Sequence, residues 1–445
     1  MKVWHVLHGF PPETAGGTES VVEALARAMQ GHGCDVTVVS GSLRVGDPAA
    51  VERSDLDGLP VLRLHRDDLY FESWFKAYAP AVSAAFRALL REHRPDVVHV
   101  HHWLRLSSDL VRIARAAGCI TAVTCHDYFS ALARPVRLVG EGAATPPPAP
   151  SYVGAAELAE AFAFHRDDFA DELRAAHCRF APSAAQRAGL AQLLPGDVGD
   201  FTSIGLPSTV AALRRLPESD PHGSRARRRR LCTWGTLYPE KGLESVLDAL
   251  ARTPAALGWS LDVYGEAHSP TFRDDLLARA AGLRVTWHGR FVPQDLERAD
   301  VDYAVLPSLA DESYGLVLDE ALQLGLPVIA SDVPAYRERA QGDASVFFPP
   351  GDATALAALL AAPARLEALQ RPNAPAPLSP ARAAADLLSR YRAAAPSPFA
   401  PRVTDRERAL YLFRRAERRL WSALQQGEAP APPDEFLAPP PAAGA

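Results

Sequence analysis

The sequence predicts an α/β protein made of two doubly wound domains that face each other across a cleft. The chain has 445 residues, which is more than one ordinary hydrophobic core accommodates. Apolar, strand-like stretches alternate with helical stretches, an order typical of parallel sheets covered on both faces. This alternation starts twice, on either side of a stretch between Leu206 and Arg230 that is rich in proline and charge.

The composition limits the function classes. Apolar residues make up 48% of the chain and charged residues 22%, which is typical of a soluble globular protein. The formal net charge of −6 provides no general basic field, so we expect no nucleic-acid partner. The first ten residues lack the apolar core of a signal peptide, and no run approaches the ~20 apolar residues of a membrane span. Five scattered cysteines without a CxxC pair fit reduced thiols. We therefore expect a cytoplasmic protein.

The first domain is expected over residues 1–205. Its predicted strands are 2–9, 34–41, 94–103, 120–128 and 177–183, and its predicted helices include 21–33 and 108–118. Each strand is a short, mostly apolar run, as is usual for strands buried on both faces. Strands joined through helices imply right-handed crossovers and a parallel sheet.

The second domain is expected over residues 206–375 and repeats this order. Its predicted strands are 230–237, 260–267, 284–291, 302–308, 327–332 and 345–351, and its predicted helices are 241–253, 293–300, 315–325 and 352–362. In open α/β sheets, ligands bind at the carboxyl ends of the strands. Two such edges facing each other predict a binding cleft between the domains.

The rest of the chain extends beyond these two domains. Residues 376–395 are expected to form a helix that crosses back to the first domain. Residues 396–445 are expected to hold an amphipathic helix over 404–426, which begins with a capping box at Thr404 and Glu407, and then a disordered tail rich in proline and alanine. The arginines of this helix suit contact with an anionic membrane surface. The alternative is an extra helix packed on the body of the protein.

Two glycines, Gly16 and Gly17, fall between the first predicted strand and the first predicted helix. Glycines at this place allow the backbone to approach a ligand closely, and the helix N-terminus attracts a phosphate. Their spacing differs from the G-x-G-x-x-G of dinucleotide enzymes, which weighs against a nicotinamide cofactor.

Lys241 is one of only three lysines, beside 44 arginines, and it lies at a helix start in the second domain. Cations favour helix C-termini, so a lysine here needs an anion beside it. A compact ammonium suits a phosphate group. The position predicts a phosphate contact.

The stretch DESYGLVLDE holds two glutamates eight residues apart, Glu312 and Glu320. If a helix starts near Gly315, Glu312 stays in the loop before it and Glu320 lies roughly 7.5 Å along its axis. The two carboxylates then bracket a helix N-terminus. A nucleotide sugar fits this arrangement, with the sugar near Glu312, the diphosphate at the helix end and the ribose hydroxyls on Glu320. The amides expected beside the sugar are those of Tyr314, Gly315 and Leu316.

These motifs resemble a large glycosyltransferase family, the family 4 type, which contains the sucrose and glycogen synthases. The resemblance covers residues 1 to about 395. It is carried by the E-x7-E pair, EKG at 240–242, GGTE at 16–19, HD at 126–127 and APS at 181–183. It implies the GT-B fold, in which two Rossmann-like domains face each other across a cleft, and transfer with retention of configuration.

The resemblance also implies roles for individual residues. Lys241 would bind the diphosphate and Glu320 the ribose, while Glu312 and the amides after it would bind the donor sugar. Gly17 would contact the diphosphate from across the cleft, and His126 the sugar near its reacting carbon. One departure concerns Thr236, because the family usually has arginine at this place. Either Arg290 replaces that arginine or donor binding is weakened.

A histidine-rich stretch at residues 99–102 raises the question of a metal. His99 and His101 share one face of a predicted strand. No carboxylate cluster accompanies them in the sequence, so we predict no metal site.

The function expected from these residues is that of a metal-independent, retaining glycosyltransferase of the hexosyltransferase type. Its donor would be a nucleotide-diphosphate sugar, and its acceptor a glycan, a lipid or a small molecule; no cofactor is expected. The alternatives are a nucleotide-sugar-binding protein without transfer activity, an epimerase or phosphorylase with the same fold, and a glycoside hydrolase that uses the two glutamates.

Overall fold

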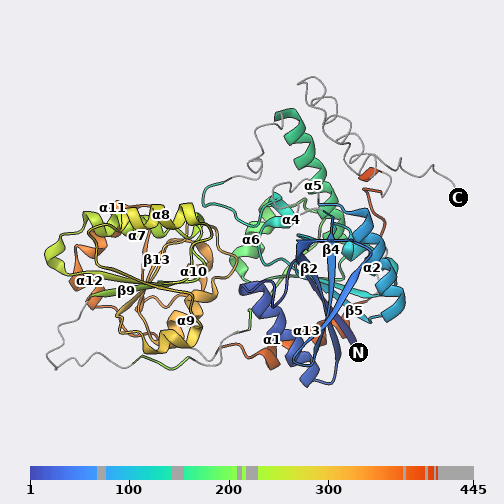
Figure 1. Ribbon diagram of the computed structural model, residues 1–445, viewed down its shortest axis with the longest axis horizontal. Coiled ribbons are helices and arrows are strands. Elements are labelled where there is room, and N and C mark those ends of the chain that lie inside the picture. Colours follow the sequence, from blue (N-terminus) through green and yellow to red (C-terminus); the bar gives the residue numbers. More distant parts are fainter. Residues whose placement is uncertain are drawn as a thin grey trace.

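The computed structural model describes residues 1–67, 77–141, 155–207, 213–216, 229–373, 377–395, 399–404 and 407–408. In these ranges the chain forms two separate sheets, each covered by helices on both faces (Figure 1). The first sheet ends with Ser203 and the second begins with Arg230. The proline-rich stretch 206–230 therefore lies between them, and much of it is outside the described residues.

The first sheet has eight strands in the order β3-β4-β2-β1-β5-β6-β7-β8. Its strands are β1 (Lys2–Leu7), β2 (Asp35–Val45), β3 (Val51–Leu56), β4 (Leu59–Arg66), β5 (Val97–Val100), β6 (Ile120–Thr124), β7 (Cys178–Ala181) and β8 (Thr202–Ser203). Neighbouring strands run parallel, except for β3, which pairs with β4 in an antiparallel hairpin. The hairpin is an addition to the five strands predicted for this domain.

Seven helices in the described ranges cover this sheet. They are α1 (Gly17–Gly31), α2 (Pro80–His93), α3 (Leu110–Ala116), α4 (Phe129–Leu132), α5 (Ala155–Ala175), α6 (Ala184–Leu193) and α13 (Pro380–Ala393). Helix α1 buries Val21, Val22, Leu25 and Met29, whose spacing of three and four residues forms one apolar stripe. This stripe fixes the start of α1 at the carboxyl edge of β1.

The second sheet has six parallel strands in the order β11-β10-β9-β12-β13-β14. They are β9 (Arg230–Trp234), β10 (Ser260–Tyr264), β11 (Val285–Gly289), β12 (Tyr303–Leu306), β13 (Val328–Ser331) and β14 (Ser345–Phe348). Its α-helices are α7 (Leu243–Arg252), α8 (Pro270–Arg279), α9 (Leu316–Leu324), α10 (Pro334–Arg339), α11 (Ala353–Leu360) and α12 (Pro363–Glu367). The predicted helix 293–300 is a 3₁₀ helix over Pro293–Arg298.

Helix α13 follows the second sheet in sequence but packs beside α1 of the first (Figure 1). Leu387, Leu388 and Tyr391 of α13 are buried in one cluster with Leu25 of α1. The hydroxyl of Tyr391 also lies 2.7 Å from Nδ1 of His99. Helix α13 therefore contributes to the core of the first domain.

A short segment after α13 is docked on the first domain by polar contacts. The amides of Arg402 and Val403 donate to Asp171, and Nε of Arg408 donates to Asp168 at 2.6 Å. The predicted capping box is present, since the Thr404 amide donates to Glu407 and the Glu407 amide donates to the Thr404 hydroxyl. Residues 409–426 of the predicted amphipathic helix lie outside the described residues. Among the described helices, none has the length and apolar character needed to span a bilayer.

Candidate active site

The loop between β12 and α9 touches both domains. Its Ser313 carbonyl accepts a hydrogen bond from the Ser183 hydroxyl at 2.6 Å, and its Asp311 carboxylate accepts one from the Tyr128 hydroxyl at 3.0 Å. Arg137 of the first domain pairs with the same Asp311 oxygen. These contacts hold the carboxyl edges of the two sheets against each other, and this loop carries the first glutamate of the predicted pair.

Lys241 and Glu312 form an ion pair at this edge. Nζ of Lys241 lies 2.8 Å from Oε1 of Glu312, and the Ser308 hydroxyl donates to the same oxygen at 2.7 Å. Burial alone would raise the pKa of Glu312, but the Lys241 ammonium and the two hydrogen bonds lower it below the usual range. The pKa of Lys241 is raised, first by the charge of Glu312. Both groups are therefore charged at neutral pH.

Each partner of this pair keeps hydrogen-bonding capacity. The Lys241 side chain is 47% exposed, and an ammonium has three N–H donors, of which Glu312 takes one. Oε2 of Glu312 makes no hydrogen bond within the described part of the chain. The pair offers an anion a cation, and it offers a hydroxyl a carboxylate oxygen.

Glu320 lies in α9 and is held by a tryptophan. The indole N–H of Trp234, at the end of β9, donates to Oε2 of Glu320 at 2.6 Å. Burial raises the pKa of Glu320, and the tryptophan hydrogen bond only partly offsets this. The two predicted glutamates thus have different surroundings: Glu312 faces a cation, whereas Glu320 faces a neutral donor.

The N-terminus of α9 is shaped by a glycine and an arginine. Gly315 has φ of +77°, and a Cβ on it would lie 2.5 Å from the Tyr336 ring, so a larger residue would be strained there and would clash. The guanidinium of Arg339 donates to the carbonyls of Tyr314 and Gly315 and pairs with Asp319. The arginine thus fixes the backbone before α9, and the first amides of a helix have no partner in a preceding turn.

The glycine pair lies opposite this helix. Helix α1 starts at Gly17, and a Cβ built on Gly17 would lie 3.4 Å from the Leu316 side chain of α9. The starts of α1 and α9 therefore approach each other across the domain boundary. Gly16 is extended, with φ of −163°, and a Cβ there would lie 2.8 Å from Oε2 of Glu19. Both glycines are exposed.

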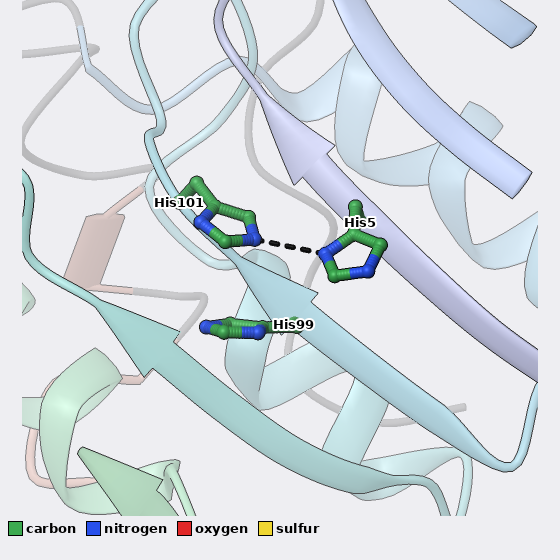
Figure 2. A group of neighbouring side chains, drawn as sticks. All are labelled: His5, His99 and His101. Carbon is green, nitrogen blue, oxygen red and sulfur yellow. Dashed lines mark hydrogen bonds between the residues drawn. The ribbon is translucent and has the colours of Figure 1, made fainter. Parts of the chain in front are cut away.

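His126 follows β6 and is 8% exposed. Its Nε2 lies 2.9 Å from Nδ1 of His101. Nε2 of His101 in turn lies 2.9 Å from Nδ1 of His5 (Figure 2). Burial lowers the pKa of His126 to about 4, so the ring is neutral at pH 7. It can act as a hydrogen-bonding group, but it carries no charge.

Thr236, which stands where the family usually has arginine, and Arg290, its predicted replacement, both lie at the carboxyl edge of the second sheet. Thr236 follows β9 and is exposed. Arg290 follows β11, two strands away, and its side chain is 87% exposed with a carboxylate oxygen of Glu266 at 3.4 Å. Replacement of the family arginine by Arg290 stays a prediction.

Five further residues support this site, and none of them was predicted from the sequence to take part in it. They are Trp234, Ser308, Arg339, His5 and His101. Trp234 is the only one with a sequence signal, because it ends the first strand of its domain, where ligand-binding residues gather. Ser308 acts on Glu312, four residues away in the same loop, whereas Arg339, His5 and His101 act through partners that become neighbours only in the fold.

Comparisons with known proteins agree with this arrangement. A family model described as Glycosyltransferase Family 4 matches residues 15–197, and one described as Glycosyl transferases group 1 matches residues 228–362. The D-inositol 3-phosphate glycosyltransferase of Rhodococcus erythropolis is 28% identical over 90% of this chain and 93% of its own length. The glycogen synthase of Mycobacterium tuberculosis is 27% identical over 80% and 84%.

Solved structures show the same fold. The sucrose-phosphate synthase of Thermosynechococcus elongatus superposes with a TM-score of 0.61 at 19% identity, covering 95% of this chain and 100% of that one. An Anabaena protein in complex with UDP-glucose gives a TM-score of 0.56 at 18% identity, over 88% and 95%. The two family models together match more than half of the chain. The chain therefore belongs to the glycosyltransferases of the family 4 type and has the GT-B fold.

Proposed function

We propose that this glycosyltransferase moves a hexose from a nucleotide-diphosphate sugar to an acceptor, with retention of configuration and without a metal ion. The observation that carries the proposal is the Lys241–Glu312 pair, which lies just before the N-terminus of α9, with Glu320 on the first turns of that helix. A cation beside a helix N-terminus suits a diphosphate, and the two carboxylates suit hydroxyl groups on either side of it.

In this proposal, groups of the protein replace a metal ion in stabilising the diphosphate. Lys241 and the amides at the start of α9 stabilise the negative charge that develops on the leaving diphosphate. Gly17 approaches from the other domain, so that the backbone of α1 closes on the same phosphate. Oε2 of Glu312 accepts a hydrogen bond from a hydroxyl of the sugar, and Glu320 accepts hydrogen bonds from the ribose hydroxyls.

The transfer step is proposed to proceed on one face of the sugar. The bond from the anomeric carbon to the phosphate oxygen breaks, and the bond to the acceptor oxygen forms on the same face. The acceptor's proton passes to the departing diphosphate, which is stable as an anion. Closure of the two domains would exclude water and limit hydrolysis of the donor.

The relatives support a sugar donor of this class and leave the acceptor open. Their names include an inositol phosphate glycosyltransferase and a glycogen synthase, whose acceptors differ in size. The Anabaena protein of similar fold was solved with UDP-glucose, so UDP-glucose is the first donor to test. A glycan, a lipid and a small polyol are the acceptor classes to compare.

The test is a donor screen followed by analysis of the product. Thermal shift with nucleotide sugars of UDP, GDP, ADP and TDP identifies the donor, and NMR of the product gives its anomeric configuration. We expect transfer in the presence of EDTA, with the configuration of the donor retained. Binding without product across the acceptor classes would point to a binding protein instead.

A glycoside hydrolase is the other outcome that this test separates. The lowered pKa of Glu312 and the raised pKa of Glu320 would also suit a nucleophile and an acid. Release of sugar from aryl glycosides with no nucleotide present would contradict the proposal.

A further inference from the structure

Three buried histidines form a row that runs from the centre of the first sheet to its carboxyl edge. Nδ1 of His5 lies 2.9 Å from Nε2 of His101, and Nδ1 of His101 lies 2.9 Å from Nε2 of His126. His5 belongs to β1, His101 directly follows β5, and His126 follows β6, and these are neighbouring strands. Figure 2 shows the first of these links, between the rings of His5 and His101.

The row has only two proton arrangements. Burial lowers the pKa of His5 and of His126 to about 4, and that of His101 well below its usual value, so each ring carries one N–H at neutral pH. Each of the two contacts needs one donor and one acceptor. Either all protons point along the row toward His126, which then carries its proton on Nδ1, or all point toward His5, which then carries its proton on Nε2.

The inner end of the row decides between these arrangements. Nε2 of His5 is buried and has no hydrogen-bond partner among the residues that the structure describes. In the second arrangement this atom would be a buried N–H without an acceptor, whereas in the first it is an unused lone pair. Orphaned buried donors are rarer than under-satisfied acceptors. We propose that His5 and His101 are positioning residues that hold His126 in the tautomer with its proton on Nδ1.

The outer residue of the row, His126, borders a cavity. Nδ1 of His126 makes no hydrogen bond to another residue that the structure describes. His126 and His101 line a cavity of about 260 Å³ between the sheet edge and the segments that join the two domains, together with Thr124, Leu206, Leu378 and Arg382. An N–H at this place suits a hydroxyl oxygen of the sugar or of the acceptor, and this last step rests on the proposed function.

A metal ion is the rival use of these rings. Ring nitrogens of His5, His99 and His101 all lie within 4.8 Å of one another. However, His99 already uses both nitrogens, with the Tyr391 and Thr124 hydroxyls each at 2.7 Å. The nitrogens that His5 and His101 turn toward each other are also paired. A metal would have to break these hydrogen bonds in a fully buried site that holds no carboxylate among the three.

The tautomer can be measured directly, without a substrate. Histidine labelled with ¹⁵N gives separate ring-nitrogen shifts for the two tautomers of His126. We expect Nδ1–H in the parent and in His99→Gln, a control that lies in the same cluster but outside the row. We expect His101→Leu to return His126 toward Nε2–H, which free neutral histidine favours, and His101→Gln to preserve Nδ1–H in part, because an amide can still donate.

Kinetics then test the consequence for the reaction. His5→Leu and His101→Leu should lower kcat by about tenfold with little change in nucleoside diphosphate affinity, while His101→Gln recovers part of the loss and His99→Gln has little effect. Thermal unfolding shows whether each variant is folded. The tautomer result stands even if the proposed transfer reaction fails. An Nε2–H tautomer of His126 in the parent, or uptake of one Zn²⁺ that displaces the His5–His101 contact, would overturn the inference.

Discussion

At the scale of single residues, the ion pair between Lys241 and Glu312 is the feature closest to the proposed chemistry. Each group favours the charged form of the other, in agreement with the raised pKa of Lys241 and the lowered pKa of Glu312. Because the Lys241 side chain is 47% exposed, the ammonium remains accessible to an incoming anion. Lys241 therefore offers its own charge to a phosphate at a helix start, where a cation is otherwise unfavourable.

Replacing this lysine should specifically affect phosphate binding. Lys241→Ala is expected to weaken the binding of the nucleoside diphosphate by roughly 1.5–3 kcal/mol, the value of a charged hydrogen bond, and to leave the nucleoside almost unaffected. Calorimetry with UDP and uridine measures both. Arg252→Ala is the matched control. Arg252 is the last residue of α7, and within the described residues its side chain donates a hydrogen bond to the Thr354 hydroxyl only. Equal diphosphate affinity in Lys241→Ala and the parent would disprove the phosphate role.

A second residue-scale prediction concerns pH. His165 is buried against Phe129 and Phe169, its Nε2 bonds the Phe129 carbonyl at 2.9 Å, and burial lowers its pKa to about 4. Between pH 7 and pH 5 the unfolded chain gains a proton that the folded ring does not, so the parent loses stability as the pH falls.

This loss is about 2 kcal/mol for one histidine over that interval. Denaturant unfolding of the parent and of His165→Leu at both pH values isolates the contribution of His165, because the two proteins have all other titrating groups in common. The parent's advantage over the variant should shrink by about this amount at pH 5. An equal difference at pH 7 and pH 5 would show that His165 does not titrate in this way.

At the scale of elements, the sequence predicted helices and strands that have a clear local pattern of apolar residues. The helix over residues 315–325 is α9, which begins at Leu316, one residue after the predicted start. The hairpin of β3 and β4 was not predicted, although Asp57 and Gly58 at its turn both have positive φ and form a common hairpin signal. Helix α10 was also missed because it is only six residues long.

Missing α10 had consequences for the site. It carries Tyr336, which forces a glycine at position 315, and Arg339, which holds the carbonyls before α9. The histidine row shows the same limit. The shared strand face of His99 and His101 follows from the sequence, but the contact of His101 with His5 and His126 requires the strand order β1-β5-β6. Such partners are set by tertiary packing and leave no local pattern.

The docked residues 399–404 and 407–408 yield an element-scale prediction. Arg408 is almost fully buried and pairs with Asp168, so removing it leaves a buried carboxylate with one cation fewer. Arg408→Met is expected to cost about 3–5 kcal/mol of unfolding free energy. Arg390→Met is the control, because its pair with Asp386 is exposed and is worth about 0–1 kcal/mol. Denaturant unfolding distinguishes them, and equal costs would show that the segment contributes little to the fold.

At the scale of the whole molecule, two sheets meet through a few polar contacts and a shared apolar cluster. Ser313 and Asp311 reach the first domain, and Tyr314 is buried in a cluster with Leu206 and α13. The alternation of elements predicted two doubly wound domains, and the resemblance carried by E-x7-E and the other motifs implied the family and its GT-B fold; the comparisons confirm both. The donor base and the acceptor did not follow from sequence, because they depend on loop contacts.

The central claim is that the two glutamates around the start of α9 bind different parts of one nucleotide sugar. Calorimetry of UDP, or of the diphosphate that the donor screen identifies, with Glu320→Ala and Glu312→Ala tests it most directly, beside turnover of the donor. We predict that Glu320→Ala lowers the affinity for the nucleoside diphosphate by about tenfold or more, because the variant loses the contact with the ribose. Glu312→Ala should keep the diphosphate affinity and lose turnover. Equal loss of diphosphate binding in both folded variants would contradict the account.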